Sequence, residues 1–352
     1  MKEPFVRFFR ENFRPPQRPS AAGAQQPRIA FIDLAKGVCI LLVVMMHAGL
    51  GHGFPGLRAL RMPLYFMLSG LFFKDYGSFR LFVEKKVNKI LVPFLFFALL
   101  GFADQALTAL GEGRALTAYG LWQPFVSPSM TRSNLPVWFL VSLFWANLIY
   151  CAVSIHVGRL WLRTLAVFAL GGAGYALSQG KVYLPLFFAS SLTALPFFFA
   201  GSLLRRLPLL YAGRGRRLAP LLGVALVGAG AGFCAWFGTP AIDFRTNFYA
   251  GSPLIAFPLS VVLVVGLLLV CKGAGWLPVV SYMGRYSIVV LGLHCVLMAH
   301  VRALLGRLTG HAPGAWAVFL STAAACWLLI PFCRAFLPHV TAQRDWFRLS
   351  KK

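Results

Sequence analysis

The chain has 352 residues, of which 59% are hydrophobic and only 12% are charged. Soluble domains carry about twice that share of charged residues, so the composition excludes a soluble globular protein. The formal net charge is +25, with 34 Lys and Arg residues against nine Asp and Glu residues. Because the basic residues stand between apolar segments, they indicate membrane topology and contact with lipid head groups, and no nucleic-acid partner is expected.

Apolar runs long enough to cross a bilayer recur along the chain. They predict an all-α polytopic membrane protein of about ten transmembrane helices, at 29–50, 55–74, 88–110, 136–155, 161–178, 184–204, 218–237, 253–271, 284–304 and 314–336. The first run is too long for a typical signal-peptide core, so we expect it to be a retained helix. The predicted membrane-embedded domain is 29–337, between a basic N-terminal tail, 1–28, and a basic C-terminal tail, 338–352.

The positive charges predict the orientation of the helices. With the N-terminus inside, 25 Lys and Arg residues fall in inside segments, eight fall outside and one lies within the first helix. The inside segments are 1–28, 74–89, 155–163, 205–217, 272–285 and 334–352. Basic residues are enriched in cytoplasmic loops, so both termini are predicted to be cytoplasmic.

The first predicted helix contains three ionisable residues, Asp33, Lys36 and His47. Asp33 and Lys36 are three residues apart and can pair as a boundary ion pair. Lys36 and His47 are eleven residues apart, which places them on nearly the same helix face and roughly 16 Å apart along the axis. An interfacial role for His47 is the alternative, but we favour a functional one, because His47 ends a strongly apolar run and an imidazole exchanges protons near neutral pH.

The second predicted helix continues this polar pattern with Arg58, Arg61, Tyr65 and Ser69. Spacings of three and four residues put them on one helix face. The connection to the first helix is short, so both arginines are expected near His47. The alternative, that the arginines extend to the lipid head groups, is stronger for Arg58 than for Arg61.

Further candidates lie later in the chain. Trp138 begins the fourth helix and is either an interfacial aromatic residue or part of a site. Arg245 and Tyr249 lie in one predicted outside loop, and His294 lies within the ninth helix, where a hydrogen bond to a neighbouring helix is an equal alternative to function. The seven cysteines show no CxxC or Cys/His ligand spacing, so neither a disulfide framework nor a metal site is expected.

Three motifs resemble those of the acyltransferase-3 family of membrane O-acyltransferases. The first is Asp33-Leu-Ala-Lys36-Gly37, with ten residues between Lys36 and His47; many family members carry Arg at the position of Lys36. The second is Arg61-Met-Pro-Leu-Tyr-Phe-Met-Leu-Ser69-Gly70. The third is 79–93, and 137–140 and 286–294 are weaker matches.

The resemblance implies transfer of an acyl group, with acetyl expected, from cytoplasmic acyl-CoA to a hydroxyl of a cell-surface glycan or its lipid-linked precursor. It implies His47 as the base, with a covalent acetyl-His47 intermediate left open. Arg61 would stabilise the oxyanion or hold the acceptor, and Lys36 would contact the thioester carbonyl or a phosphate of CoA. CoA would be attracted by Lys85, Lys86 and Lys89, and the substrates bound by Asp33, Ser69, Tyr65, Trp138, Arg245, Tyr249 and His294.

No permanently bound cofactor is expected, since acyl-CoA is a co-substrate, and the expected location is the plasma (inner) membrane of a bacterium. The main alternative is a transporter that moves a lipid-linked sugar or an anion along the same polar face. A non-catalytic membrane scaffold is the third reading, and it would leave that face unexplained.

Overall fold

The computed structural model describes residues 29–51, 56–113, 134–205 and 218–349. In this part of the chain nine helices are long and apolar enough to cross a membrane, and two short strands form the one sheet. The predicted fold class, a polytopic all-α membrane protein, is therefore confirmed. The longer elements are α2 (Ala30–Met45), η1 (Met46–Leu50), α3 (Leu57–Leu71), α4 (Phe79–Lys86), η3 (Val87–Leu91), α5 (Val92–Gly111), α7 (Trp138–His156), α8 (Leu160–Gln179), α9 (Phe188–Leu204), α11 (Leu218–Phe237), α12 (Pro253–Ala274), α13 (Pro278–Arg285), α14 (Ser287–Thr309) and α15 (Ala315–Phe336).

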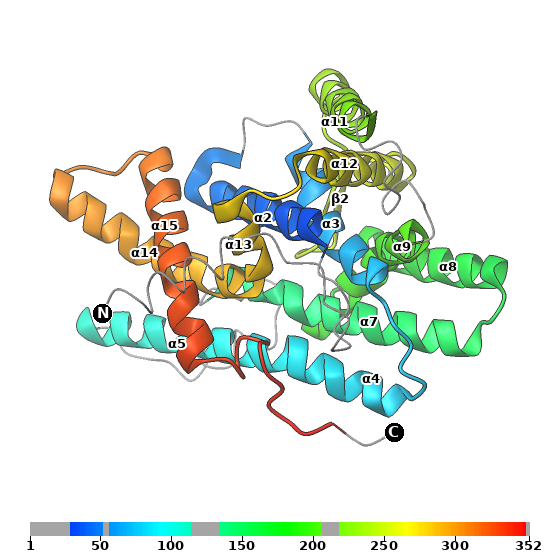
Figure 1. Ribbon diagram of the computed structural model, residues 1–352, viewed down its shortest axis with the longest axis horizontal. Helices are drawn as coiled ribbons and strands as arrows, with labels where there is room; N and C mark the ends of the chain where they lie inside the picture. Colours follow the sequence, from blue (N-terminus) through cyan, green and yellow to red (C-terminus); the bar gives the residue numbers. More distant parts are fainter. Residues whose placement is uncertain (1–28, 52–55, 114–133, 206–217, 350–352) are drawn as a thin grey trace, which may run out of the picture.

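Helix α2 lies in the middle of the molecule, with α4 and α5 along one side and α11 on the opposite side (Figure 1). It packs against α3, α12, α13 and α14. Ala35, Cys39 and Val44 on this helix are completely buried. The polar residues of the first helix are therefore held inside the protein, where an ionisable side chain can be shielded from lipid.

Helix α3 corresponds to the second predicted span, but it has only 15 residues. Its length is about 22 Å, against a bilayer core of about 30 Å. It is an interior helix, and two glycines show how closely it approaches α9. A Cβ atom on Gly70 would overlap the carbonyl oxygen of Phe198, and a Cβ atom on Gly201 would overlap the carbonyl oxygen of Met67. Small residues permit such close helix contacts in membranes.

Two predicted inside segments are in part helical, which corrects the expected loops. The third helix begins at Phe79 rather than 88, because α4, η3 and α5 form one continuous stretch. Ser78 caps it by accepting a hydrogen bond from the Leu81 N–H, and an Arg80–Glu84 ion pair supports its first turns. Hydropathy marks only the apolar part of a helix, so these charged turns were missed.

The second such segment, predicted as the loop 272–285, contains α13. This helix packs closely on α2, where a Cβ atom on Gly284 would overlap the Asp33 carbonyl oxygen and one on Gly37 would overlap that of Val280. Eight residues give too little hydropathy signal to be distinguished from a loop.

The predicted outside loop 238–252 contains a small antiparallel hairpin, β1 (Ala241–Asp243) and β2 (Phe248–Ala250), with Ile242 opposite Tyr249. Phe244 in its turn is 1% exposed and packs against aromatic rings of α3 and α9. The turn of the hairpin is thus inserted between the helices, whereas Phe248 and Ala250 of β2 are exposed.

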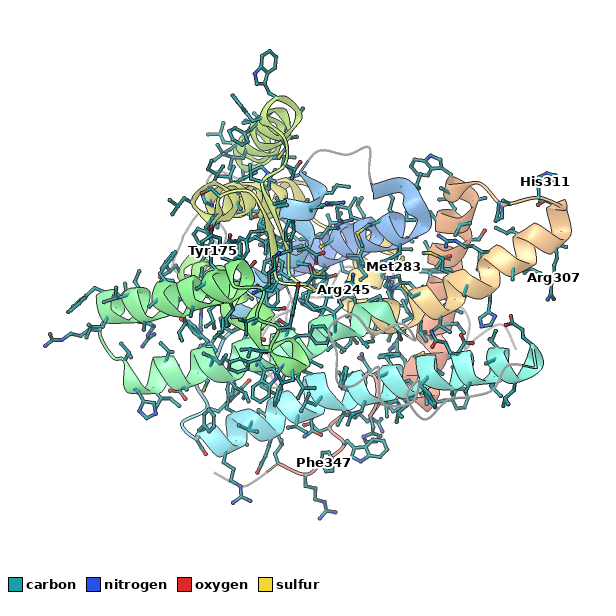
Figure 2. All side chains as sticks on the ribbon, turned by 180° about the vertical axis from the view of Figure 1, so that it is seen from behind. Tyr175, Arg245, Met283, Arg307, His311 and Phe347 are labelled. Carbon is teal, nitrogen blue, oxygen red and sulfur yellow. The ribbon has the colours of Figure 1, made fainter. Side chains whose placement is uncertain are left out.

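The C-terminal segment folds back against η3, between α4 and α5. The Asn88 side chain accepts hydrogen bonds from the Trp346 and Phe347 N–H groups at 2.8 Å, and Lys89 pairs with Asp345 at 2.9 Å; Figure 2 labels Phe347 at this edge of the molecule. Both segments were predicted to lie on the same side of the membrane, and their contact agrees with that. The predicted N-terminal tail, 1–28, lies outside the described residues, and the cytoplasmic location of both termini stays a prediction.

Candidate active site

Two cavities meet inside the helix bundle. The His47 cavity has a volume of about 300 Å³ and is lined by Val43, Met46, His47, Arg58, Arg61, Met62, Pro136, Trp138, Phe139, Ile242, Asp243, Phe244, Arg245 and Leu291. The Lys36 cavity has a volume of about 290 Å³ and is lined by Lys36, Ile40, Tyr65, Leu68, Ser69, Phe72, Lys86, Lys89, Ile90, Phe139, Leu140, Leu143, Ser287, Ile288 and Leu291. Phe139 and Leu291 line both cavities, so these two side chains form the partition between them.

His47 stands where the first helix loses its α-helical form. It lies in the π-helical turn η1, which ends in a kink at Gly49 with φ of 100°. Arg302 of α14 donates a hydrogen bond to the His47 carbonyl oxygen at 2.9 Å. π-Helical turns are frequent at functional sites, and here the turn holds His47 at the wall of its cavity.

The nearest aromatic ring to His47 recorded in the described structure is that of His294, with the two ring centroids 5.2 Å apart. His294 is completely buried, and its Nδ1 lies 2.9 Å from the Val290 carbonyl oxygen. A carbonyl oxygen only accepts, so Nδ1 is the donor, and in the neutral ring Nε2 then carries a lone pair. That Nε2 atom is buried without a hydrogen-bond partner among the described residues.

His47, His294 and Cys295 each offer an atom within 4.8 Å of the others, which makes them a candidate metal group. Nitrogen and sulfur ligands suit Zn²⁺. However, Arg61 and Arg245 line the same cavity as His47, and Arg302 contacts its carbonyl. A divalent cation is disfavoured among so many fixed positive charges, and the group is better suited to proton transfer.

The arginines of α3 lie where the sequence predicts them, beside His47. Arg61 is 5% exposed, and its Nη1 is 3.5 Å from the Leu42 carbonyl oxygen. Arg58, one turn earlier, is exposed at the same cavity. Trp138 is only 7% exposed and also lines this cavity, so its interpretation as a lipid-facing interfacial residue is wrong.

The same face of α3 continues into the Lys36 cavity. The Tyr65 hydroxyl donates to the Lys36 carbonyl oxygen at 3.1 Å, and Ser69 exchanges a hydrogen bond with the Asn147 side chain. The Lys36 ammonium lies 5.6 Å from the Phe72 ring centroid. Together with Lys86 and Lys89, this lysine gives the cavity a positive charge suited to phosphate.

Four predicted site residues line neither cavity: His294, whose ring lies beside that of His47, and Asp33, Tyr249 and Lys85. Asp33 pairs with Arg285 of α13 at 3.6 Å, and α13 covers that face of α2. The Tyr249 hydroxyl donates to Thr193 at 3.0 Å, and burial raises the pKa of its phenol to about 12. The Lys85 ammonium lies 3.8 Å from the Tyr76 ring centroid, beside the Lys36 cavity rather than in it.

The structure also adds residues that the sequence did not single out. Arg302 holds the His47 backbone, and Phe139 and Leu291 separate the cavities. In a sequence, an arginine near the end of a helix such as Arg302 is interpreted as a head-group contact. Apolar residues in apolar helices, such as Phe139 and Leu291, show no local pattern that distinguishes them as site residues.

Residues 29–331 match the acyltransferase-3 family, whose description is "Acyltransferase domain". The chain belongs to the acyltransferase-3 family. No curated protein and no solved structure matched the chain. The family's match covers all the helices that line the two cavities, so this acyltransferase is a multi-pass membrane protein with an acyl donor and an acceptor as its substrates. The family decides against the transporter and scaffold alternatives.

Proposed function

We propose that the chain transfers an acyl group, expected to be acetyl, from cytoplasmic acyl-CoA to a hydroxyl of a cell-surface glycan or its lipid-linked precursor. The observation that supports this is the pair of cavities that meet at Phe139 and Leu291, one with lysines and one with His47 and arginines. Each cavity offers the chemistry that one of the two substrates needs. The proposed location is the inner membrane of a bacterium, with both termini in the cytoplasm.

The donor is proposed to bind in the Lys36 cavity. CoA carries phosphates, which Lys86 and Lys89 attract at the cavity wall, with Lys85 next to them. The apolar side chains of Ile40, Phe72 and Leu143 suit the pantetheine arm. In this arrangement the arm extends past the partition, and Lys36 contacts a CoA phosphate or the thioester carbonyl.

The acceptor is proposed to bind in the His47 cavity, with the sugar ring against Trp138. A His47 nitrogen takes the proton of the acceptor hydroxyl while the hydroxyl oxygen attacks the thioester carbonyl carbon. The negative charge moves to the carbonyl oxygen, where Arg61 stabilises it. The intermediate collapses with cleavage of the C–S bond, and the CoA thiolate takes the proton from His47, which restores the neutral base.

Mass spectrometry of cell-surface glycans from cells with and without the gene tests this function. We expect the ester to disappear without the gene and to return with the wild-type chain. His47→Ala should not restore it, whereas His311→Ala should, since His311 is exposed just beyond the C-terminal end of α14 (Figure 2). Equal ester content in all these cells would contradict the proposal.

A further inference from the structure

The His47 cavity has a large excess of positive charge. Within the described structure Arg58, Arg61 and Arg245 line it, and Asp243 is the one carboxylate there. The catalytic step needs a base and one cation near the oxyanion. Arg58 and Arg245 therefore remain without a role in the chemistry.

Asp243 does not neutralise these arginines. Its Oδ1 accepts hydrogen bonds from the backbone N–H groups of Arg245 at 3.0 Å and Thr246 at 3.4 Å, which closes the hairpin turn. The ion pairs found among the described residues lie elsewhere and include neither Arg58 nor Arg245. The two guanidinium groups thus face the cavity without a carboxylate partner in the described part of the chain.

Arg245 is held in this position by its neighbours in the hairpin. On one side Phe244 is buried against Phe66 and Phe197, with ring centroids 5.3 Å and 5.6 Å away. On the other side Asn247 accepts a hydrogen bond from Thr193 at 2.7 Å and donates one to the Gly174 carbonyl oxygen at 2.9 Å. The hairpin is therefore anchored in the helix bundle, and Arg245 is fixed near the middle of the molecule (Figure 2).

A half-buried guanidinium inside a membrane protein is costly to keep without a counter-charge. Its planar fork is suited to the two oxygens of a carboxylate or a phosphate. The volume of about 300 Å³ is at the low end for small-molecule sites and suits one sugar with a small charged group. The arrangement favours a ligand that supplies the missing negative charge.

We propose that the acceptor carries an anionic group, a phosphate or a carboxylate, close to its reacting hydroxyl, and that Arg58 and Arg245 bind this group. The inference rests on the proposed function, since it names the class of acceptor for the same site. Arg58 is at the exposed end of the cavity and Arg245 is on the hairpin, so they hold the anion from two elements. Arg61 on α3 then remains available to stabilise the oxyanion.

Calorimetric titration of the purified full chain in detergent tests the site with three probes: inorganic pyrophosphate, galacturonate and neutral galactose. We expect one or both anions to bind and galactose to bind at least tenfold more weakly. Binding of pyrophosphate alone supports a lipid-linked diphosphate as the source of the charge. Binding of galacturonate alone supports an acidic sugar. Absence of binding by both anions overturns the proposal.

Variants assign the anion to its cavity. Arg58→Gln combined with Arg245→Gln should weaken anion binding at least tenfold, whereas Arg307→Gln, at an exposed position on the outer part of α14 (Figure 2), should not change it. The single variant Arg245→Lys, which keeps the charge and loses the fork, should lie between wild type and the double variant. If Lys86→Gln were the one variant to weaken anion binding, the anion would bind in the Lys36 cavity, and the proposal would be overturned.

Acyl transfer measured in parallel separates this inference from the proposed function. Transfer of labelled acetyl from acetyl-CoA to neutral glycans, without any anion binding, would overturn the anionic acceptor and leave the transferase. Arginine-dependent anion binding with no transfer of label to any glycan would overturn the glycan transferase and leave the anion site.

Discussion

The imidazole rings of His47 in η1 and His294 in α14 lie beside each other, with their centroids 5.2 Å apart and their planes inclined at 51°. The Nδ1 atom of His294 is engaged by the Val290 carbonyl oxygen, which leaves Nε2 as the atom available to accept a hydrogen bond. An acceptor at this place would fix which nitrogen of His47 carries the proton, directly or through one water. We expect His294 to act through His47 as a positioning residue.

Two substitutions of His294 separate positioning from packing. The amide of His294→Asn can replace Nδ1 at the Val290 carbonyl but does not reach the place of Nε2. The longer amide of His294→Gln can present an oxygen there. A buried hydrogen bond lost costs about 1–3 kcal/mol, so Asn should lower the transfer rate about fivefold to a hundredfold, and Gln should retain more of it.

The measurement for this pair is transfer of labelled acetyl by membranes that contain equal amounts of each variant. If the His294→Asn variant transferred acetyl at least as fast as the His294→Gln variant, a positioning role through Nε2 would be refuted. Equal and complete inactivity of both, with normal amounts of folded protein, would also count against it.

Lys36 and Arg61 should affect different substrates, because they line different cavities. Lys36→Ala should weaken acyl-CoA binding tenfold or more, since a charged hydrogen bond contributes about 1.5–3 kcal/mol. Arg61→Ala should mainly reduce transfer to the acceptor. Titration of purified variants with acyl-CoA measures the first effect, with Arg61→Lys as a charge-preserving control. Equal losses of CoA affinity in both alanine variants would mean that both cations surround one thioester.

Phe139 should keep water away from the thioester. It is 4% exposed and lines both cavities, in contact with the Tyr65 and Phe66 rings. Phe139→Ala would open the partition, and we expect CoA thiol release to exceed ester formation on the glycan. Phe139→Leu, which keeps most of the volume, is the matched control. The two products are measured in the same membranes, and an unchanged ratio in Phe139→Ala would show that this side chain is not a barrier.

The orientation in the membrane is open to a direct test. The charge distribution predicts cytoplasmic termini, and the contact of Asn88 with Phe347 places the C-terminal segment beside η3, within the predicted inside segment 74–89. A reporter that is active only in the periplasm should be inactive when fused after Lys352 and active within the loop 111–135. Periplasmic activity at the C-terminus would contradict the predicted alternation of the helices.

The sequence by itself determined the membrane class, the helical segments and one part of the site. Hydropathy and helical spacing are local properties, so they were sufficient to put Lys36 and His47 on one helix and Arg58, Arg61, Tyr65 and Ser69 on one face of the next. They also predicted that the arginines lie near His47, because the connection between the two helices is short. The structure confirms this arrangement.

Only the tertiary structure decided which distant residues complete the site. His294, Arg302 and the hairpin with Arg245 reach His47 through contacts between elements far apart in the chain. Asp33 pairs with Arg285 because glycines let α13 pack directly on α2. Such contacts depend on how the helices fit against one another in three dimensions, and the period of a single helix contains no information about its neighbour.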